Sequence, residues 1–382
     1  MRLLRAEIVG LLGKSDPIKI SFNEDLNITT GKNGAGKTTL IKLLWYVISG
    51  NVGTAIAEVQ FQRVSITTDK YRVNITKVSD DTCKGDFTES GKTVSIEDFY
   101  DDESEELSDA REKFNRILAP HGRSLFFPTF RRIEGGFTIG SSERFSSPSL
   151  FNAPRARSEL QDAVLSISRR LSELEHTFVT SISTFDVAEL LLRRYTEMSE
   201  EASSLQRQMS QDVIERIKDF KNESYTARSD DTMDSAVGVI DNIRSMIENN
   251  DRIRDSIMAP LKAVQGVVAQ LLEHSGIQIG RRINFGDAAN AINSESLSAG
   301  EKQMLSFICY NAFSEDSIIF IDEPELSLHI DWQRMLFPTL LRQKKNNQFI
   351  IATHSPFIYS KYPDKEIMLS PSRGDSAENL AS

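Results

Sequence analysis

The sequence has few cysteines, no long apolar run and no excess of positive charge, and each of these shortages excludes a class of protein. Its two cysteines, Cys83 and Cys309, lie far apart among 382 residues, and no metal-binding spacing surrounds them. We therefore exclude a disulfide framework and a thiolate metal site. No stretch approaches the roughly 18 uninterrupted apolar residues that a membrane-spanning helix needs.

The N-terminus and the charge balance indicate where the protein is located and which kinds of partner it binds. The first seven residues carry Arg2 and Arg5 where a signal peptide needs its apolar core, so we expect a cytoplasmic protein with no membrane partner. The formal charge is -10, so the field of the whole protein repels nucleic acid. Direct contact with DNA or RNA would then need a local patch or a partner protein.

Proline is missing from residues 156–259, and most of the sequence from residue 156 to 274 has helical periodicity. Polar breaks at 222–224 and 229–231 indicate short helices, so we expect a compact helical insertion rather than a long coiled coil. Its apolar stripes are interpreted as the insertion's own core, and a docking face for a partner is the less favoured alternative.

Among the features that are present, residues 31–39 match the phosphate-loop pattern G-x-x-x-x-G-K-[ST] in full. A β-favouring segment, residues 25–30, precedes the loop, and apolar residues at helical spacing follow it. Backbone N–H groups at such a helix start favour an anion. The predicted nucleotide contacts are Lys32, Asn33, Gly34, Ala35, Gly36, Lys37, Thr38 and Thr39, with Lys37 on the phosphates and Thr38 on Mg²⁺.

The run from Ser317 to Glu323 is continuously apolar until it ends in two carboxylates. A strand buried on both faces of a parallel sheet delivers acids to its carboxyl edge in this way, and the pattern matches a Walker B element. Asp322 is the predicted Mg²⁺ ligand, and Glu323 is predicted to orient or deprotonate the attacking water. In isolation, a core strand ending in an acidic turn would explain this segment, but the preceding phosphate loop favours the functional interpretation.

Two further motifs complete an ordered set. Residues 297–303, Leu-Ser-Ala-Gly-Glu-Lys-Gln, open a helix in which Ser298 and Glu301 form a capping box, and Gly300 allows backbone N–H groups to come close to an anion. A second buried strand, residues 349–353, leads into His354 at the edge where Glu323 lies. His121, His176 and His274 receive no predicted role.

These motifs resemble those of the ATP-binding-cassette (ABC) family, in the order that the family has them, and cover residues 1–140 and 276–370. Two of the motifs are more similar to the SMC-like, overcoming-lysogenisation-defect type of AAA ATPase than to transporter subunits. They are Asp-Glu-Pro-Glu-Leu-Ser-Leu-His at 322–329 and Ala-Thr-His-Ser-Pro at 352–356. Such ATPases serve bacterial antiphage systems, including Septu, PARIS and retron-associated effectors.

The resemblance implies an α/β fold: an ABC-type P-loop NTPase head with a mixed central sheet and a small antiparallel sheet, interrupted by an α-helical subdomain. It divides the chain into 1–140 and 276–370 as two parts of the head, 141–275 as the helical insertion or lid, and 371–382 as a polar tail. Alternating residues agree with this outline, because they predict a first strand at 6–11, a second at 18–22 and a hairpin at 59–66 and 71–78.

The resemblance also implies ATP and Mg²⁺ as cofactors and a homodimer, or a higher oligomer built from dimers, with two nucleotides at its interface. Each site would join Lys37, Thr38, Asp322, Glu323 and His354 of one copy to Ser298, Gly300 and Glu301 of the other. His354 would contact the γ-phosphate, and residues 324–329 would cross the interface.

The sequence departs from the family pattern in two places. No glutamine marks the loop that couples Mg²⁺ to the insertion, because the strand ending at 130–134 occupies its expected place. No TOPRIM nuclease domain follows the head, and the insertion shows no nuclease, methylase or protease pattern. We therefore expect a separate effector, an HNH or TOPRIM nuclease. The alternatives are an SMC-like repair or chromosome ATPase that binds DNA itself, a transporter's ATP-binding subunit, and a module that holds ATP without turnover.

Overall fold

The computed structural model describes residues 1–101, 106–129, 132–133, 166–182, 184–224, 231–274 and 298–373. Two compact units make up the chain. The first comprises Met1–Ser183, Glu295–Phe307 and Ser314–Ser382, and the second comprises Thr184–Ser294 and Ile308–Phe313. The predicted domain boundaries at 141 and 275 lie outside the described residues and stay predictions.

A six-stranded parallel sheet lies in the first unit. Its order is β12–β10–β14–β15–β3–β16, with bounds His176–Phe178, Ser124–Phe127, Ile318–Asp322, Gln348–Ala352, Leu26–Thr30 and Glu366–Met368. Every residue of β14 and β15 is buried, as their continuous apolar runs predicted. In the register, Asp322 pairs with Ala352 and Ala352 pairs with Thr29, so three strands end at one edge of the sheet.

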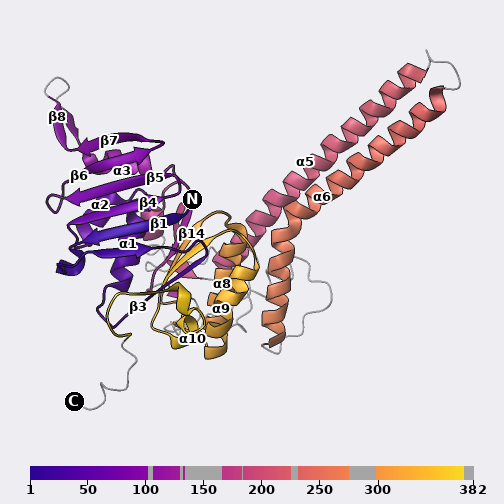
Figure 1. The fold of residues 1–382 in the computed structure, drawn as a ribbon. Helices are drawn as coiled ribbons and strands as arrows, with labels where there is room; N and C mark the ends of the chain where they lie inside the picture. Colours follow the sequence, from indigo (N-terminus) through magenta and orange to yellow (C-terminus); the bar gives the residue numbers. More distant parts are fainter. Residues whose placement is uncertain are drawn as a thin grey trace, which may run out of the picture. The chain divides into compact units, whose positions relative to one another are not determined.

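A second, antiparallel sheet follows the pattern expected from alternating residues (Figure 1). Its order is β2–β1–β4–β5–β6–β7, with bounds Ile18–Ser21, Leu3–Val9, Arg63–Thr68, Tyr71–Lys77, Cys83–Glu89 and Lys92–Glu97. Two further strand pairs are β8 with β9, at Phe99–Asp101 and Glu106–Ser108, and β11 with β13, at Arg132–Ile133 and Ser181–Ile182.

Helix α1 (Lys37–Ile48), which follows the phosphate loop, is part of the core that both sheets share. Nine of its twelve residues are buried, and a helix that is apolar on nearly every side belongs inside a protein. The Trp45 ring lies 5.4 Å from that of Phe126 and 5.2 Å from that of Phe178, measured between ring centroids. The parallel sheet and α1 therefore hold the phosphate loop in place.

The other segments of the first unit are short. They are η1 (Leu11–Gly13), α2 (Val52–Glu58), α3 (Ala110–Leu118), α9 (Ile330–Arg342), α10 (Pro356–Tyr359) and η2 (Pro363–Lys365). Helix α8 (Ala299–Phe313) belongs to the first unit up to Phe307 and to the second unit from Ile308.

The second unit contains a hairpin of two long helices, α5 (Thr184–Ser224) and α6 (Asp231–His274), which pack against each other (Figure 1). They have 41 and 44 residues, so the expectation of short, broken helices is wrong. The polar residues 222–224 mark the end of α5 and not an interruption within a helix. Pro260 is tolerated inside α6.

The predicted α/β fold class is confirmed, but two details differ. The central sheet was expected to be mixed and has only parallel pairs among its described strands, and the antiparallel sheet, expected to be small, has six strands. Most of the predicted polar tail, 371–382, lies outside the described residues. In the described part of the chain, no helix combines the length and the apolar character needed to cross a bilayer.

Candidate nucleotide and metal site

The phosphate loop connects β3 to α1, as the sequence predicted. Gly34 and Gly36 have φ angles of 77° and 98°, which side chains rarely adopt, so glycine is needed at both positions. Lys32, Asn33 and Gly34 are exposed, whereas Ala35 and Lys37 are buried. The loop thus presents its first half to solvent and anchors its second half in the protein.

The Lys37 ammonium lies over this loop and beside His354, the residue predicted to contact the γ-phosphate. Its Nζ donates to the Gly31 carbonyl at 2.9 Å and lies 2.6 Å from Nε2 of His354. Burial lowers the pKa of Lys37, and the carboxylates of Glu323, Asp322 and Glu325 oppose that change. Burial, followed by the charge of Lys37, lowers the pKa of His354. A neutral His354 that accepts a hydrogen bond from a charged Lys37 satisfies both groups.

The Asp322 carboxylate is fully buried and lies between two hydroxyl groups. Thr38 Oγ1 donates to Oδ1 at 2.9 Å, and Thr129 Oγ1 donates to Oδ2. Magnesium prefers a carboxylate and other hard oxygen ligands. The residues that the sequence predicted for the metal, Thr38 and Asp322, are therefore together and of a suitable chemical kind.

Glu323 follows β14 directly in a strained backbone conformation. Its φ angle is 47°, and its N–H donates to the Ala352 carbonyl at 2.8 Å. A left-handed conformation at a residue other than glycine costs free energy and is concentrated at functional sites. The hydrogen bond to the neighbouring strand holds Glu323 at the sheet edge where Lys37 and His354 also lie.

The turn at residues 324–329 is bonded to the loop that carries His354. Glu325 Oε1 accepts from the His354 N–H at 2.7 Å. Gln333 links the two segments again, because its Nε2 donates to the Leu328 carbonyl at 2.9 Å and its Oε1 accepts from Ser355 Oγ at 2.5 Å. A displacement of the turn would therefore also displace the loop that carries His354.

The predicted capping box at the start of α8 is confirmed. The Glu301 N–H donates to Ser298 Oγ at 3.3 Å, and the Ser298 N–H donates to Glu301 Oε2 at 2.7 Å. A Cβ atom on Gly300 would lie 2.4 Å from the Ser327 carbonyl oxygen, so glycine allows α8 to pack on the 324–329 turn. It stays a prediction that Ser298, Gly300 and Glu301 face the nucleotide bound by a second copy.

Three residues near this site were missed by sequence reasoning. Thr129 lies two residues beyond β10, next to the place where the expected glutamine was missing. Glu325 belongs to the motif but was given no role, and Lys14 donates from Nζ to the Ala35 carbonyl at 2.8 Å. No local pattern identifies them, because each reaches the site through the pairing of segments distant in sequence. The sequence predicted the end of a strand at 130–134, and three of these residues, Phe130, Arg131 and Glu134, lie outside the described residues.

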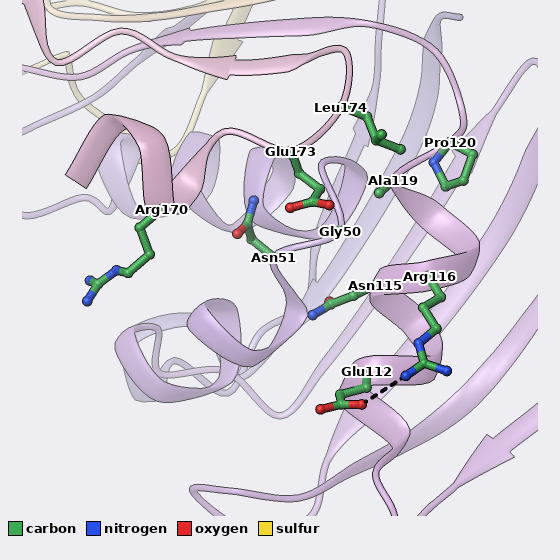
Figure 2. A pocket seen from close by; sticks show the side chains of 10 residues that line it. All are labelled: Gly50, Asn51, Glu112, Asn115, Arg116, Ala119, Pro120, Arg170, Glu173 and Leu174. Carbon is green, nitrogen blue, oxygen red and sulfur yellow. Dashed lines mark hydrogen bonds and ion pairs between the residues drawn. The ribbon is translucent and has the colours of Figure 1, made fainter. Parts of the chain in front are cut away.

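A cavity of about 520 Å³ lies elsewhere in the first unit, near the C-terminal end of α1 (Figure 2). Gly50 and Asn51 line it together with Asn115 and Arg116 of α3 and the turn at Glu173. Arg116 is paired with Glu112 there, at 3.4 Å. The lining side chains are mostly exposed and carry charges of both signs, so the chemistry of the cavity does not indicate one class of ligand.

Comparisons with known proteins agree with the motifs. A family model described as "AAA domain, putative AbiEii toxin, Type IV TA system" matches residues 26–360. The chain is 35% identical over 86 residues to the retron Ec83 probable ATPase of Escherichia coli, covering 19% of this chain and 16% of that protein. It is 24% identical over 186 residues to the retron Vc95 probable ATPase of Vibrio cholerae serotype O1 biovar El Tor, covering 41% and 36%. The match thus spans well under half of each relative.

Among solved structures, an Smc head domain with an extended coiled coil from Pyrococcus furiosus, bound to the C-terminal domain of ScpA, aligns with a TM-score of 0.42 at 13% identity, covering 94% of this chain and 91% of that one. An Smc head domain with a coiled coil and joint from Pyrococcus yayanosii gives 0.41 at 11% identity, covering 98% and 96%. The resemblance to AAA ATPases that include retron-associated ones, first indicated by the motifs, is confirmed by the family and the retron relatives.

Proposed function

This chain belongs to the AAA-domain family described as putative AbiEii toxin, Type IV TA system, and on that premise we propose that it hydrolyses ATP at an interface between two copies of itself. The observation that carries the proposal is the convergence of three separate segments on one sheet edge. Lys37 lies 2.6 Å from His354, and Thr38 lies 2.9 Å from Asp322. A lysine, a hydroxyl and a carboxylate in this arrangement suit a metal-bound triphosphate.

Each residue of the site has a defined task in this proposal. The phosphate-loop N–H groups and Lys37 would hold the phosphates, and Thr38 and Asp322 would hold Mg²⁺, which would neutralise charge on the phosphoryl group. Glu323 accepts a proton from the attacking water, whose oxygen bonds to the γ-phosphorus as the bond from that phosphorus to ADP breaks. His354, neutral beside Lys37, donates a hydrogen bond to the γ-phosphate.

The test separates binding from turnover. Lys37→Ala should lose nucleotide affinity because the phosphates lose their main cation. Glu323→Gln should bind ATP and remain in a closed dimer, because hydrolysis would be needed for release. Lys92→Ala, on the exposed edge strand β7, serves as the matched lysine control. Sedimentation velocity with and without ATP is the measurement, and identical profiles for Lys37→Ala and Glu323→Gln in ATP would contradict the dimer.

We propose further that this ATPase is the sensor or regulatory subunit of a bacterial antiphage system with a separate effector, a nuclease of the HNH or TOPRIM type. The support is that two relatives are named as retron ATPases. Phage plating on cells that carry the gene with its neighbours is the test. Protection should vanish with Lys37→Ala, and the neighbouring nuclease should co-purify with the wild-type chain. Unchanged protection by Lys37→Ala would contradict this role.

The second candidate is an SMC-like ATPase that binds DNA itself, and the long hairpin favours it. At about 1.5 Å per residue, α5 and α6 each extend roughly 60 Å, whereas the sequence predicted a compact insertion. Acidic residues outnumber basic ones in both helices, however, which disfavours phosphate contacts along them. Salt-dependent binding of duplex DNA, measured by fluorescence anisotropy, would favour this candidate over the first.

A further inference from the structure

The Asp322 carboxylate is held by two hydroxyl groups from different segments. Thr38 belongs to the first turn of α1, whereas Thr129 lies two residues beyond the end of β10. β10 and β14 are neighbours in the parallel sheet, with Phe127 paired to Ile321. The chain that leaves β10 therefore passes directly beside Asp322.

The chemistry of the three groups determines the direction of these hydrogen bonds. An ionised carboxylate only accepts, so each threonine must donate its single hydroxyl proton to Asp322. Thr38 binds Oδ1 at 2.9 Å, and Thr129 binds the opposite oxygen, Oδ2. With both oxygens held, the carboxylate has one orientation, and the lone pairs that remain on it define where a cation can bind.

We propose that Thr129 is a positioning residue of the metal site: by holding the second oxygen of Asp322 it fixes the carboxylate for Mg²⁺ bound with ATP. This inference rests on the proposed ATPase function and adds to it a residue that the motif pattern does not contain. Thr129 lies on the connection from β10 to β11, two residues after β10 ends.

A purely structural role makes a different prediction. If Thr129 only satisfied a buried carboxylate, its loss would lower stability and leave metal binding unchanged. If it positions the ligand, its loss should weaken metal binding about 10- to 100-fold, as removing partners of metal ligands does. The affinity for nucleotide without metal should stay unchanged, because Thr129 contacts the carboxylate and not the phosphate loop.

The experiment compares Thr129→Val with Thr129→Ser in the full chain. Mn²⁺ is titrated in the presence of a non-hydrolysable ATP analogue and followed by electron paramagnetic resonance, and analogue affinity is measured separately in EDTA. We expect Thr129→Val to need about 10- to 100-fold more Mn²⁺ for half-saturation and to keep its affinity in EDTA. Thr129→Ser should restore metal binding, because it retains the hydroxyl.

Thr29 provides a matched control. It is a buried threonine on β3 of the same sheet, and among the described residues its hydroxyl has no hydrogen-bond partner. Thr29→Val should leave the Mn²⁺ titration unchanged. Thr129→Ala is measured as well, so that the result does not depend on how valine fits.

The outcomes separate this inference from the function it rests on. Mn²⁺ saturation at the wild-type concentration in a folded Thr129→Val or Thr129→Ala protein would overturn the inference, even if Thr38→Ala abolished metal binding and the ATPase assignment stood. Failure of the wild-type chain to bind the analogue at all would overturn the proposed function and this inference with it.

Discussion

The nucleotide-binding unit and the helical hairpin are stabilised in different ways. In the first unit, β14 and β15 are buried along their whole length, and buried polar groups find partners far away in the sequence, such as Thr38 with Asp322. In the hairpin, most described side chains are exposed, including large apolar ones such as Ile214 and Ile240. The first unit therefore depends on contacts among many segments distant in sequence, whereas the hairpin depends on helix formation and on the packing of α5 against α6.

The largest expected effect tests the buried polar groups of the first unit. His176 is fully buried, lies 2.7 Å from Ser124 Oγ through Nδ1, and donates from Nε2 to the Ala119 carbonyl at 3.1 Å. Burial lowers the pKa of His176 to about 4, from an ordinary value of 6.5, although the bond to Ala119 acts in the opposite direction. The neutral ring is therefore favoured in the folded protein, and the unfolded chain takes up the proton first as the pH falls.

The contribution of neutral His176 to the free energy of unfolding should thus be complete above pH 6.5. It should be lost as the pH falls from 6.5 through about 4, by about 3 kcal/mol in total. Urea unfolding at several pH values, followed by the fluorescence of Trp45 and Trp332, reports on the first unit, which contains both. His176→Gln should remove this part of the pH dependence, whereas His329→Gln, at an exposed site, should retain it. A pH profile unchanged by His176→Gln would contradict the assignment.

The second prediction concerns a backbone contact near the site. Gly300→Ala places a Cβ atom 2.4 Å from the Ser327 carbonyl oxygen, so α8 and the 324–329 turn must move apart. We expect the first unit to lose about 1–3 kcal/mol of stability, as overpacked sites do. The same urea experiment at pH 7.5 measures this loss. Wild-type stability would show that the turn adjusts freely and that glycine is not required for packing.

The smallest expected effect has the opposite sign. Gly238 lies inside α6, and a Cβ atom built on it meets nothing within 4 Å. Gly238→Ala should therefore stabilise the helix by about 0.5–1 kcal/mol, because alanine loses less backbone freedom on folding. Hydrogen exchange of the α6 amides should become slower. Faster exchange would mean that this surface of the hairpin is covered in solution and that the contrast between the two regions is smaller than the structure indicates.

Sequence patterns predicted the local features of this protein well. The phosphate loop, the buried run ending at Asp322 and the capping box of Ser298 with Glu301 are contiguous patterns whose residues dictate their own geometry, and the structure has all three. The length of the hairpin helices was predicted wrongly. A polar stretch such as 222–224 is compatible both with a break between short helices and with the turn between two long helices. Only the packing of α5 on α6 distinguishes these cases.

The sequence by itself determined which segments carry phosphate and metal chemistry, because strand, loop and helix propensities act over a few residues at a time. Tertiary structure alone decided which side chains complete the site. Thr129, Glu325 and Lys14 come close to Asp322, His354 and the phosphate loop only because strand pairing and turn packing bring distant segments to one sheet edge. Such contacts depend on the register between strands, and no short stretch of sequence encodes that register.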